Sequence, residues 1–291
     1  MRSLQVHVPA GCPNKCPFCC SAAHHNQKNA KMTVNRIHFL PRMNYARDHD
    51  CDFLMLTSTG EPLMNPDYIE TILSFNRELR RPFDAIDLQT SGAGLDNAML
   101  GRIRDSGITT IALSVAYLLD SKKNAKIMRM PERYQYNIGG LCSKIKELGF
   151  TLRLCLNLIP DYKPISAVTD HVVGEIFETA KVYGADQITF KRLYANKDPK
   201  TEDEKAIHKW VLDGTSTTEH LAKRINTRIK FEGRKIATLP GGEEVYSING
   251  MSTVLMSDCQ AQRLTDTPRY FILRPNGKLY TRWDDDGSII F

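Results

Sequence analysis

Three cysteines near the start of the chain have a spacing that suits a metal centre. Cys12, Cys16 and Cys19 follow one another as C-x3-C-x2-C. Three thiols crowded into eight residues are not the pattern of a disulfide framework, because most of the other cysteines lie far apart along the chain. We therefore interpret the three as metal ligands. The distant cysteines are Cys51, Cys142, Cys155 and Cys259.

Two kinds of metal site are consistent with these thiols. A structural zinc ion is coordinated by four protein ligands and keeps no open position. His24 and His25 are near enough in the sequence to complete such a set with the cysteines. Three thiolates on a four-iron cluster instead leave one iron without a protein ligand, as a catalytic cluster needs in order to bind its substrate. Cys20 adjoins Cys19, and we expect it to pack rather than to ligate.

The composition narrows the class of protein. Hydrophobic residues at 42% and charged residues at 25% are ordinary for a globular protein, and no apolar run is long enough to span a bilayer. The first residues lack the pattern of a secretory signal, so we expect a cytoplasmic protein that does not bind membranes. The net charge of +6 suits an anionic substrate, but Lys and Arg are scattered, which does not favour a nucleic acid.

The elements that position the cysteines follow a repeating pattern. Short apolar, β-rich runs alternate six times with segments of helical spacing, which predicts a parallel sheet covered by helices, either an incomplete barrel or a doubly wound sheet. Both architectures place their chemistry at the carboxyl ends of the strands. The predicted strands are Leu4 to Val8, Phe53 to Thr57, Ala85 to Gln89, Thr110 to Val115, Thr151 to Ile159 and Gln187 to Leu193.

The alternation of predicted strands and helices ends at about Trp210. We predict a division into residues 1–210, which form the α/β body, and residues 211–291, a C-terminal cap or extension. The extension contains a helix near Thr218 to Thr227 and a β-hairpin whose strands flank the turn residues Pro275 to Gly277.

A second motif, at the end of the second predicted strand, supports the interpretation of the cysteines as cluster ligands. The run Thr57-Ser58-Thr59-Gly60-Glu61-Pro62 follows the strand one β/α unit after C-x3-C-x2-C, whose last cysteine is preceded by the aromatic Phe18. The cysteine motif resembles the signature of the radical S-adenosylmethionine (SAM) superfamily, and Gly-Glu-Pro is similar to its Gly-Gly-Glu-Pro motif, with Thr59 in place of the first glycine.

The resemblance implies a partial (β/α)6 TIM-like barrel with a [4Fe-4S] cluster on Cys12, Cys16 and Cys19. It implies that SAM binds the iron left open, with its ammonium received near Gly60, Glu61 and Pro62. Polar residues at the other strand ends are then expected to bind the rest of SAM, and Lys191 and Arg192 are suited to a carboxylate. The expected cofactor-binding residues are Phe18, Gly60, Glu61, Pro62, Gln89, Ser114, Asn157, Lys191 and Arg192.

The implied activity is reductive cleavage of SAM to a 5′-deoxyadenosyl radical that abstracts hydrogen from a small-molecule, nucleotide or peptide substrate. A one-electron donor of the flavodoxin or ferredoxin type is the expected partner. Two alternatives stay open. One is a radical RNA-modifying enzyme that uses Cys259 as a catalytic residue, since short motifs also resemble RNA adenine methylsynthases; the other is a non-catalytic metal-binding scaffold.

Overall fold

The computed structural model describes residues 2–23, 34–161, 168–196, 198–239, 241–256, 268–283 and 285–291. The chain forms two compact units. Unit 1 contains Met1–Pro13, His24–Ala112 and Gln262–Phe291, and unit 2 contains Asn14–Ala23 and Leu113–Ala261. Strand β4 (Thr110–Val115) contains the point at which the chain passes from one unit to the other.

Unit 1 is built on strands from both ends of its sequence. Its strand order is β11-β10-β1-β2-β3, with β1, β2, β3 and β10 parallel and β11 antiparallel to β10. Val6 of β1 lies beside Leu56 of β2 and Leu273 of β10, and all three side chains are buried. These strands are β1 (Arg2–His7), β2 (Cys51–Thr57), β3 (Ala85–Thr90), β10 (Tyr270–Leu273) and β11 (Leu279–Tyr280).

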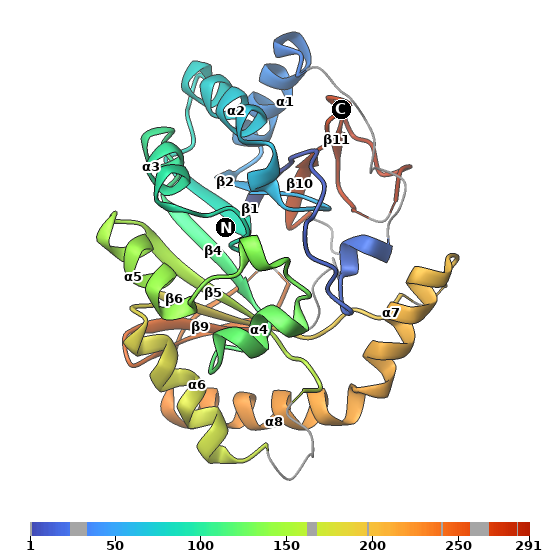
Figure 1. Cartoon of the computed structure of the whole chain (residues 1–291). Coiled ribbons are helices and arrows are strands. Elements are labelled where there is room, and N and C mark those ends of the chain that lie inside the picture. The colour runs from blue at the N-terminus through green and yellow to red at the C-terminus, as the bar shows by residue number, and fades with distance from the viewer. Residues whose placement is uncertain are drawn as a thin grey trace. The chain divides into compact units, whose positions relative to one another are not determined.

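The helices of unit 1 begin at residues suited to cap them. The side chain of Asn65 accepts a hydrogen bond from the Tyr68 N–H at the start of α2 (Pro66–Glu78), where Pro66 takes the first helical position. Asp96 caps α3 (Asn97–Asp105) in the same way. Helices α1 (Arg36–Asp48) and α2 pack side by side (Figure 1). A short 3-10 turn, η3 (Pro62–Met64), precedes α2.

Unit 2 has strand order β5-β6-β9-β8-β7. Strand β9 runs parallel to β6 although two antiparallel strands precede it in the sequence. Phe190 of β6 is fully buried against Phe177 of α6, with ring centroids 5.5 Å apart. The strands are β5 (Thr151–Asn157), β6 (Gln187–Lys191), β7 (Arg234–Thr238), β8 (Glu244–Ile248) and β9 (Met251–Met256).

The helices of unit 2 include two long C-terminal ones. A capping box, in which Thr201 and Glu204 satisfy each other's backbone N–H groups, starts α7. Helix α8 packs beside α6 and against β8 and β9 (Figure 1). The helices are η1 (Cys20–Ala23), α4 (Ser121–Ile127), η4 (Glu132–Tyr134), α5 (Ile138–Glu147), α6 (Asp170–Val182), α7 (Glu202–Asp213) and α8 (Thr215–Glu232).

The six predicted strands are confirmed, with ends that match or shift by at most two residues, and the hairpin around Pro275 to Gly277 is present as β10 and β11. Helix α8 contains the segment predicted near Thr218 to Thr227. Helix α7 and strands β7 to β9 were not predicted. The division of the chain at residue 210 stays a prediction. Among the described residues, no helix combines the length and apolarity that a membrane crossing requires.

Candidate functional site

The Gly-Glu-Pro turn at the end of β2 is organised around a buried carboxylate. Glu61 is 1% exposed. Its Oε1 accepts hydrogen bonds from the Thr90 hydroxyl at 2.7 Å and from the Leu63 N–H at 3.3 Å. Its Oε2 accepts from the Ser91 N–H at 2.7 Å and from the Ser91 hydroxyl at 2.6 Å. Both oxygens are therefore occupied by protein donors that tie the end of β2 to the end of β3.

The protonation of Glu61 reflects two opposing effects. Burial raises the pKa of its carboxyl above the ordinary value, and the hydrogen bonds from Ser91, Thr90 and Leu63 lower it, with burial the larger effect. A carboxylate that accepts several hydrogen bonds inside a protein is costly to replace, because each donor would lose its partner. The arrangement makes Glu61 a positioning residue for the turn.

The turn after β2 lies directly on the backbone that leads into the cysteine motif. The Glu61 N–H donates to the Gly11 carbonyl at 3.0 Å. A Cβ added to Gly60 would lie 2.1 Å from the Ala10 carbonyl oxygen and 2.7 Å from the Gly11 carbonyl carbon, so any side chain here would displace one backbone from the other. Glycine at position 60 thus permits the two predicted motifs to meet.

Side chains before Gly60 fasten the same contact. The Ser58 hydroxyl donates to the Val8 carbonyl at 2.7 Å and accepts from the Gly60 N–H at 2.8 Å. Nε2 of His7, a residue 1% exposed in β1, lies 3.2 Å from the Thr59 hydroxyl oxygen. Thr59, which replaces a glycine of the family motif, therefore contributes a side-chain contact that glycine lacks.

The three predicted cluster ligands are accessible thiols. Cys12 is exposed, and Cys16 and Cys19 are half-buried, whereas Cys51, Cys142 and Cys155 are buried. The Cys16 thiol donates to the Met128 carbonyl oxygen at an S–O distance of 3.4 Å. Soft, accessible thiols at this spacing fit an iron–sulfur cluster, while burial raises the pKa of Cys51 and Cys142 to about 12 and keeps them protonated.

The described residues include no group of three or more His, Cys, Asp or Glu side chains placed to hold a single metal ion. Thiolate ligands of a cluster come together on the metal itself, because binding releases their protons and orders the loop that carries them. His24 and His25, the residues considered for a zinc site, lie outside the described residues, as does Cys259. The ligand set Cys12, Cys16 and Cys19 stays a proposal.

Phe18 and Trp210 anchor the loop between the last two cysteines of the motif. Phe18 is 8% exposed, and its ring centroid lies 5.8 Å from that of Trp210 in α7. Pairs of aromatic rings at this separation contribute packing energy beyond their buried area. Phe18 is thus a packing residue of this loop, and its expected contact with SAM stays a prediction.

The other strand-end residues divide into two groups. In unit 1, Gln89 accepts a hydrogen bond from the Thr57 hydroxyl at 3.3 Å, which places it beside the Gly-Glu-Pro turn. In unit 2, Asn157 of β5 and Lys191 of β6 are cross-strand neighbours. Ser114 is half-buried in β4.

Arg192 already has an anionic partner. Its guanidinium Nη1 lies 3.0 Å from Oε1 of Glu219 in α8, so a second carboxylate would share it or displace Glu219.

Four residues of the site escaped sequence reasoning. Thr90 and Ser91 donate hydrogen bonds to Glu61. The sequence offered one sign of them, since two hydroxyl residues directly follow Gln89. The Met128 carbonyl receives both the Cys16 thiol and the Lys15 N–H, the latter at 3.3 Å, and no sequence pattern marks a backbone carbonyl. Trp210 is visible in the sequence only as an isolated tryptophan, and this does not reveal that it packs on Phe18.

The comparisons with known proteins identify the family and the fold of this chain. The radical SAM superfamily model matches residues 6–162, more than half of the chain. No curated protein matches the sequence at a significant level.

Three solved structures share the fold. The first is Streptococcus suis SuiB bound to S-adenosylmethionine, with TM-score 0.58 and 16% identity over 95% of this chain. The chain spans 59% of the length of SuiB. The second is anSMEcpe with bound AdoMet, with TM-score 0.65 and 13% identity over 99% of this chain and 73% of that one.

The third structure is coproporphyrinogen III oxidase (HemN) from Escherichia coli, a radical SAM enzyme, with TM-score 0.50 and 15% identity over 80% of this chain and 53% of that one. The α/β fold with an open, largely parallel sheet is that of a partial TIM-like barrel. An enzyme of this kind works with a [4Fe-4S] cluster and SAM. The chain belongs to the radical SAM superfamily.

Proposed function

We propose that this enzyme holds its [4Fe-4S] cluster on Cys12, Cys16 and Cys19, cleaves SAM reductively there, and uses the product radical to abstract hydrogen from a peptide. When bound, the reduced cluster supplies one electron to the sulfonium of SAM, which releases methionine and a 5′-deoxyadenosyl radical. The observation that carries the proposal is the contact of the Gly60–Glu61 backbone with Gly11, the residue before the first cluster cysteine.

Glu61 would act through position. Because its two oxygens are held by Thr90, Ser91 and Leu63, the carboxylate fixes the turn after β2 rather than exchanging protons with SAM. A fixed turn presents its backbone groups to the methionine part of SAM at no further ordering cost. The absence of a Cβ at Gly60 lets this turn approach the cysteine loop closely.

The strand-end residues would hold the rest of SAM. Gln89, Ser114 and Asn157 supply neutral donors and acceptors suited to the ribose and adenine. Lys191 supplies an ammonium for the methionine carboxylate, and Arg192 supplies a guanidinium if Glu219 is shared. Correct placement matters because the radical abstracts hydrogen from any nearby C–H bond, so the chain must align its target and exclude other donors.

A peptide is the substrate class best supported among the three that the sequence left open. SuiB has been crystallised with its precursor peptide SuiA, and anSMEcpe with AdoMet and the Kp18Cys peptide. The donor of the single electron is proposed to be a protein of the flavodoxin or ferredoxin type.

Deuterium transfer tests the substrate class. The reconstituted enzyme is incubated anaerobically with SAM, dithionite and a pool of fully deuterated peptides, and 5′-deoxyadenosine is analysed by mass spectrometry. Deuterium from the peptide pool is expected in the product, and none from a deuterated nucleotide pool. Transfer from the nucleotides alone would overturn the peptide assignment.

A further inference from the structure

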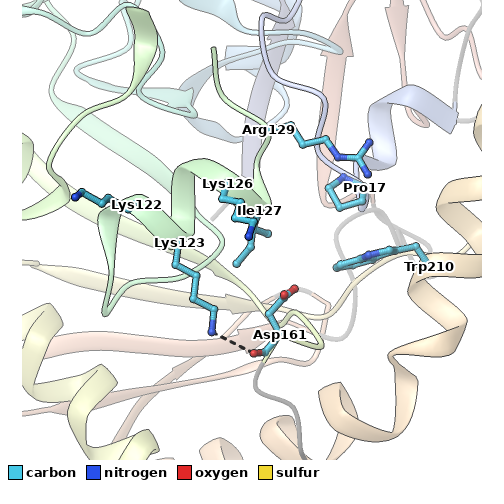
Figure 2. Close-up of a pocket in the computed structure, with 8 residues that line it drawn as sticks. All are labelled: Pro17, Lys122, Lys123, Lys126, Ile127, Arg129, Asp161 and Trp210. Carbon is cyan, nitrogen blue, oxygen red and sulfur yellow. Dashed lines mark hydrogen bonds between the residues drawn. The ribbon is translucent and has the colours of Figure 1, made fainter. Parts of the chain in front are cut away.

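A cavity of unit 2 lies beside the cysteine loop and is rimmed by positive charge (Figure 2). Its volume is about 520 Å3. Three lysines of α4, together with Arg129, line it, and Asp161 is the one carboxylate among the described residues of the lining. The lining residues are Pro17, Lys122, Lys123, Lys126, Ile127, Arg129, Asp161 and Trp210.

Three of the four cations are available to a partner. Lys122, Lys126 and Arg129 are exposed, and in the part of the chain that the structure describes no carboxylate forms an ion pair with them. Lys122 and Lys126 are one helical turn apart, so they lie on the same face of α4. Lys123 is engaged, since its Nζ donates to the Asp161 carbonyl at 3.3 Å and lies 3.8 Å from the centre of the Tyr117 ring.

The backbone of Arg129 has a conformation that residues other than glycine rarely adopt. Its φ is 49°, in the left-handed region. A residue in this region commonly follows the last turn of a helix. Arg129 lies just past the end of α4, where its N–H donates to the Lys126 carbonyl at 3.1 Å and the Met130 N–H donates to the Ala125 carbonyl at 2.9 Å, and its side chain lines the cavity (Figure 2).

The rim is joined to the cysteine loop by direct contacts. Met128, between the lining residues Ile127 and Arg129, accepts hydrogen bonds at its carbonyl from the Cys16 thiol and the Lys15 N–H. Pro17 follows Cys16 and lines the cavity itself. Trp210, drawn beside Pro17 in Figure 2, packs on Phe18 of the same loop, with the two rings tilted by 39°. A partner bound here would lie next to the loop that carries two of the three proposed cluster ligands.

We infer that Lys122, Lys126 and Arg129 form the docking surface for an acidic one-electron donor protein, which reduces the cluster from this side; the inference rests on the proposed function. Unpaired surface cations accelerate association with an anionic partner and orient it. In the step itself, the anionic flavin hydroquinone of a flavodoxin loses one electron and becomes the neutral semiquinone. The cluster gains that electron, and no proton moves.

The test compares two reductants on the holoenzyme. The double variant Lys122→Glu/Lys126→Glu is compared with wild type and with the control Lys144→Glu/Lys181→Glu, which makes the same charge change at exposed positions of α5 and α6. Binding of flavodoxin is measured by calorimetry, and the rate of cluster reduction by photoreduced flavodoxin is followed by the loss of cluster absorbance. Formation of 5′-deoxyadenosine with dithionite is measured in parallel.

The docking variant is expected to bind flavodoxin about tenfold or more weakly at low ionic strength and to be reduced correspondingly slowly. The control is expected to behave like wild type in both assays. The difference between wild type and the docking variant is expected to shrink as salt rises, because exposed charges are screened over about 8 Å at 0.15 M. Arg129→Asn, which removes the charge and suits a left-handed backbone, is expected to weaken binding as well.

With dithionite, the docking variant is expected to form 5′-deoxyadenosine at the wild-type rate. Equal binding of flavodoxin by wild type and the docking variant would overturn the inference. So would a dithionite rate that falls in the docking variant alone, since the surface would then serve SAM or the substrate. Failure of the proposed function itself would look different, because wild type would then form no 5′-deoxyadenosine with dithionite.

Discussion

Ser91 donates two hydrogen bonds to one oxygen of Glu61, from its N–H at 2.7 Å and from its hydroxyl at 2.6 Å. The pair joins the end of β3 to the turn after β2, and the same turn donates from the Glu61 N–H to Gly11. The relationship explains how a carboxylate that is almost completely buried fixes the turn after β2 without being exposed at the surface.

Replacing Glu61 by Gln should destabilise the protein and weaken SAM binding. The amide has one acceptor oxygen, and its NH2 group would face donors that the carboxylate now accepts from, so we expect a loss of about 1–3 kcal/mol in the free energy of unfolding. Urea denaturation and SAM titration measure the two effects. Glu178→Gln, at an exposed position of α6, is the control and should change neither. A fully stable Glu61→Gln variant would contradict the positioning role.

The raised pKa of Glu61 also predicts a pH dependence. Between the ordinary carboxyl pKa, about 4.3, and the raised value, the folded state binds more protons at this site than the unfolded state. The contribution of Glu61 to stability is therefore complete below that interval and falls as pH rises through it. The stability difference between wild type and Glu61→Gln should be larger in acid than near neutral pH, as denaturation at a series of pH values would show. A difference that grows with pH would mean that the hydrogen bonds outweigh burial.

Two glycine substitutions should change the stability of the protein in opposite directions. Gly60→Ala places a Cβ 2.1 Å from the Ala10 carbonyl oxygen, and overpacking of this kind typically costs about 1–3 kcal/mol. Gly101→Ala, in α3, has nothing within 4 Å of the added atom and should stabilise the helix by about 0.5–1 kcal/mol. Thermal unfolding of the two variants measures both signs. Equal melting temperatures would refute the close approach at Gly60.

Phe18→Ala should loosen the cysteine loop. The change removes the ring that packs on Trp210, and truncation of a buried Phe typically costs about 3–5 kcal/mol, with the lower end expected at this loop. The fluorescence of Trp210 should shift towards that of an exposed indole, and Trp210→Phe identifies its share of the signal beside Trp283. Phe18→Leu should retain most of the stability. An unshifted spectrum in Phe18→Ala would show that the two rings do not pack.

The periodic parts of the fold could be predicted from the sequence. Strands such as β4, whose bounds match the predicted Thr110 to Val115, are apolar runs bounded by polar turns, and this local signal suffices. The motif turn at Gly60 to Pro62 could be located for the same reason. Both features depend on residues that are adjacent in the sequence.

Pairings between distant residues could not be predicted. Strand β9 pairs in parallel with β6, although the antiparallel strands β7 and β8 precede it in the sequence. The six-fold alternation of strands and helices did not predict this pairing. The hairpin of β10 and β11 was predicted, but not that β10 pairs with β1. The bond from Ser91 to Glu61 depends on the register of β2 and β3, which a single sequence does not contain. Helix α7 did carry a local signal, the capping box from Thr201 to Glu204, which went unused.

The most direct test of the account is the yield of 5′-deoxyadenosine from anaerobically reconstituted protein given SAM and dithionite. Wild type and Cys142→Ser, a change at a buried cysteine outside the motif, are expected to bind iron and form the product. Cys12→Ser, Cys16→Ser and Cys19→Ser are each expected to lose the cluster absorbance and the product together. Product formation by any of these three at the wild-type rate, or its absence from wild type with a fully loaded cluster, would contradict the account.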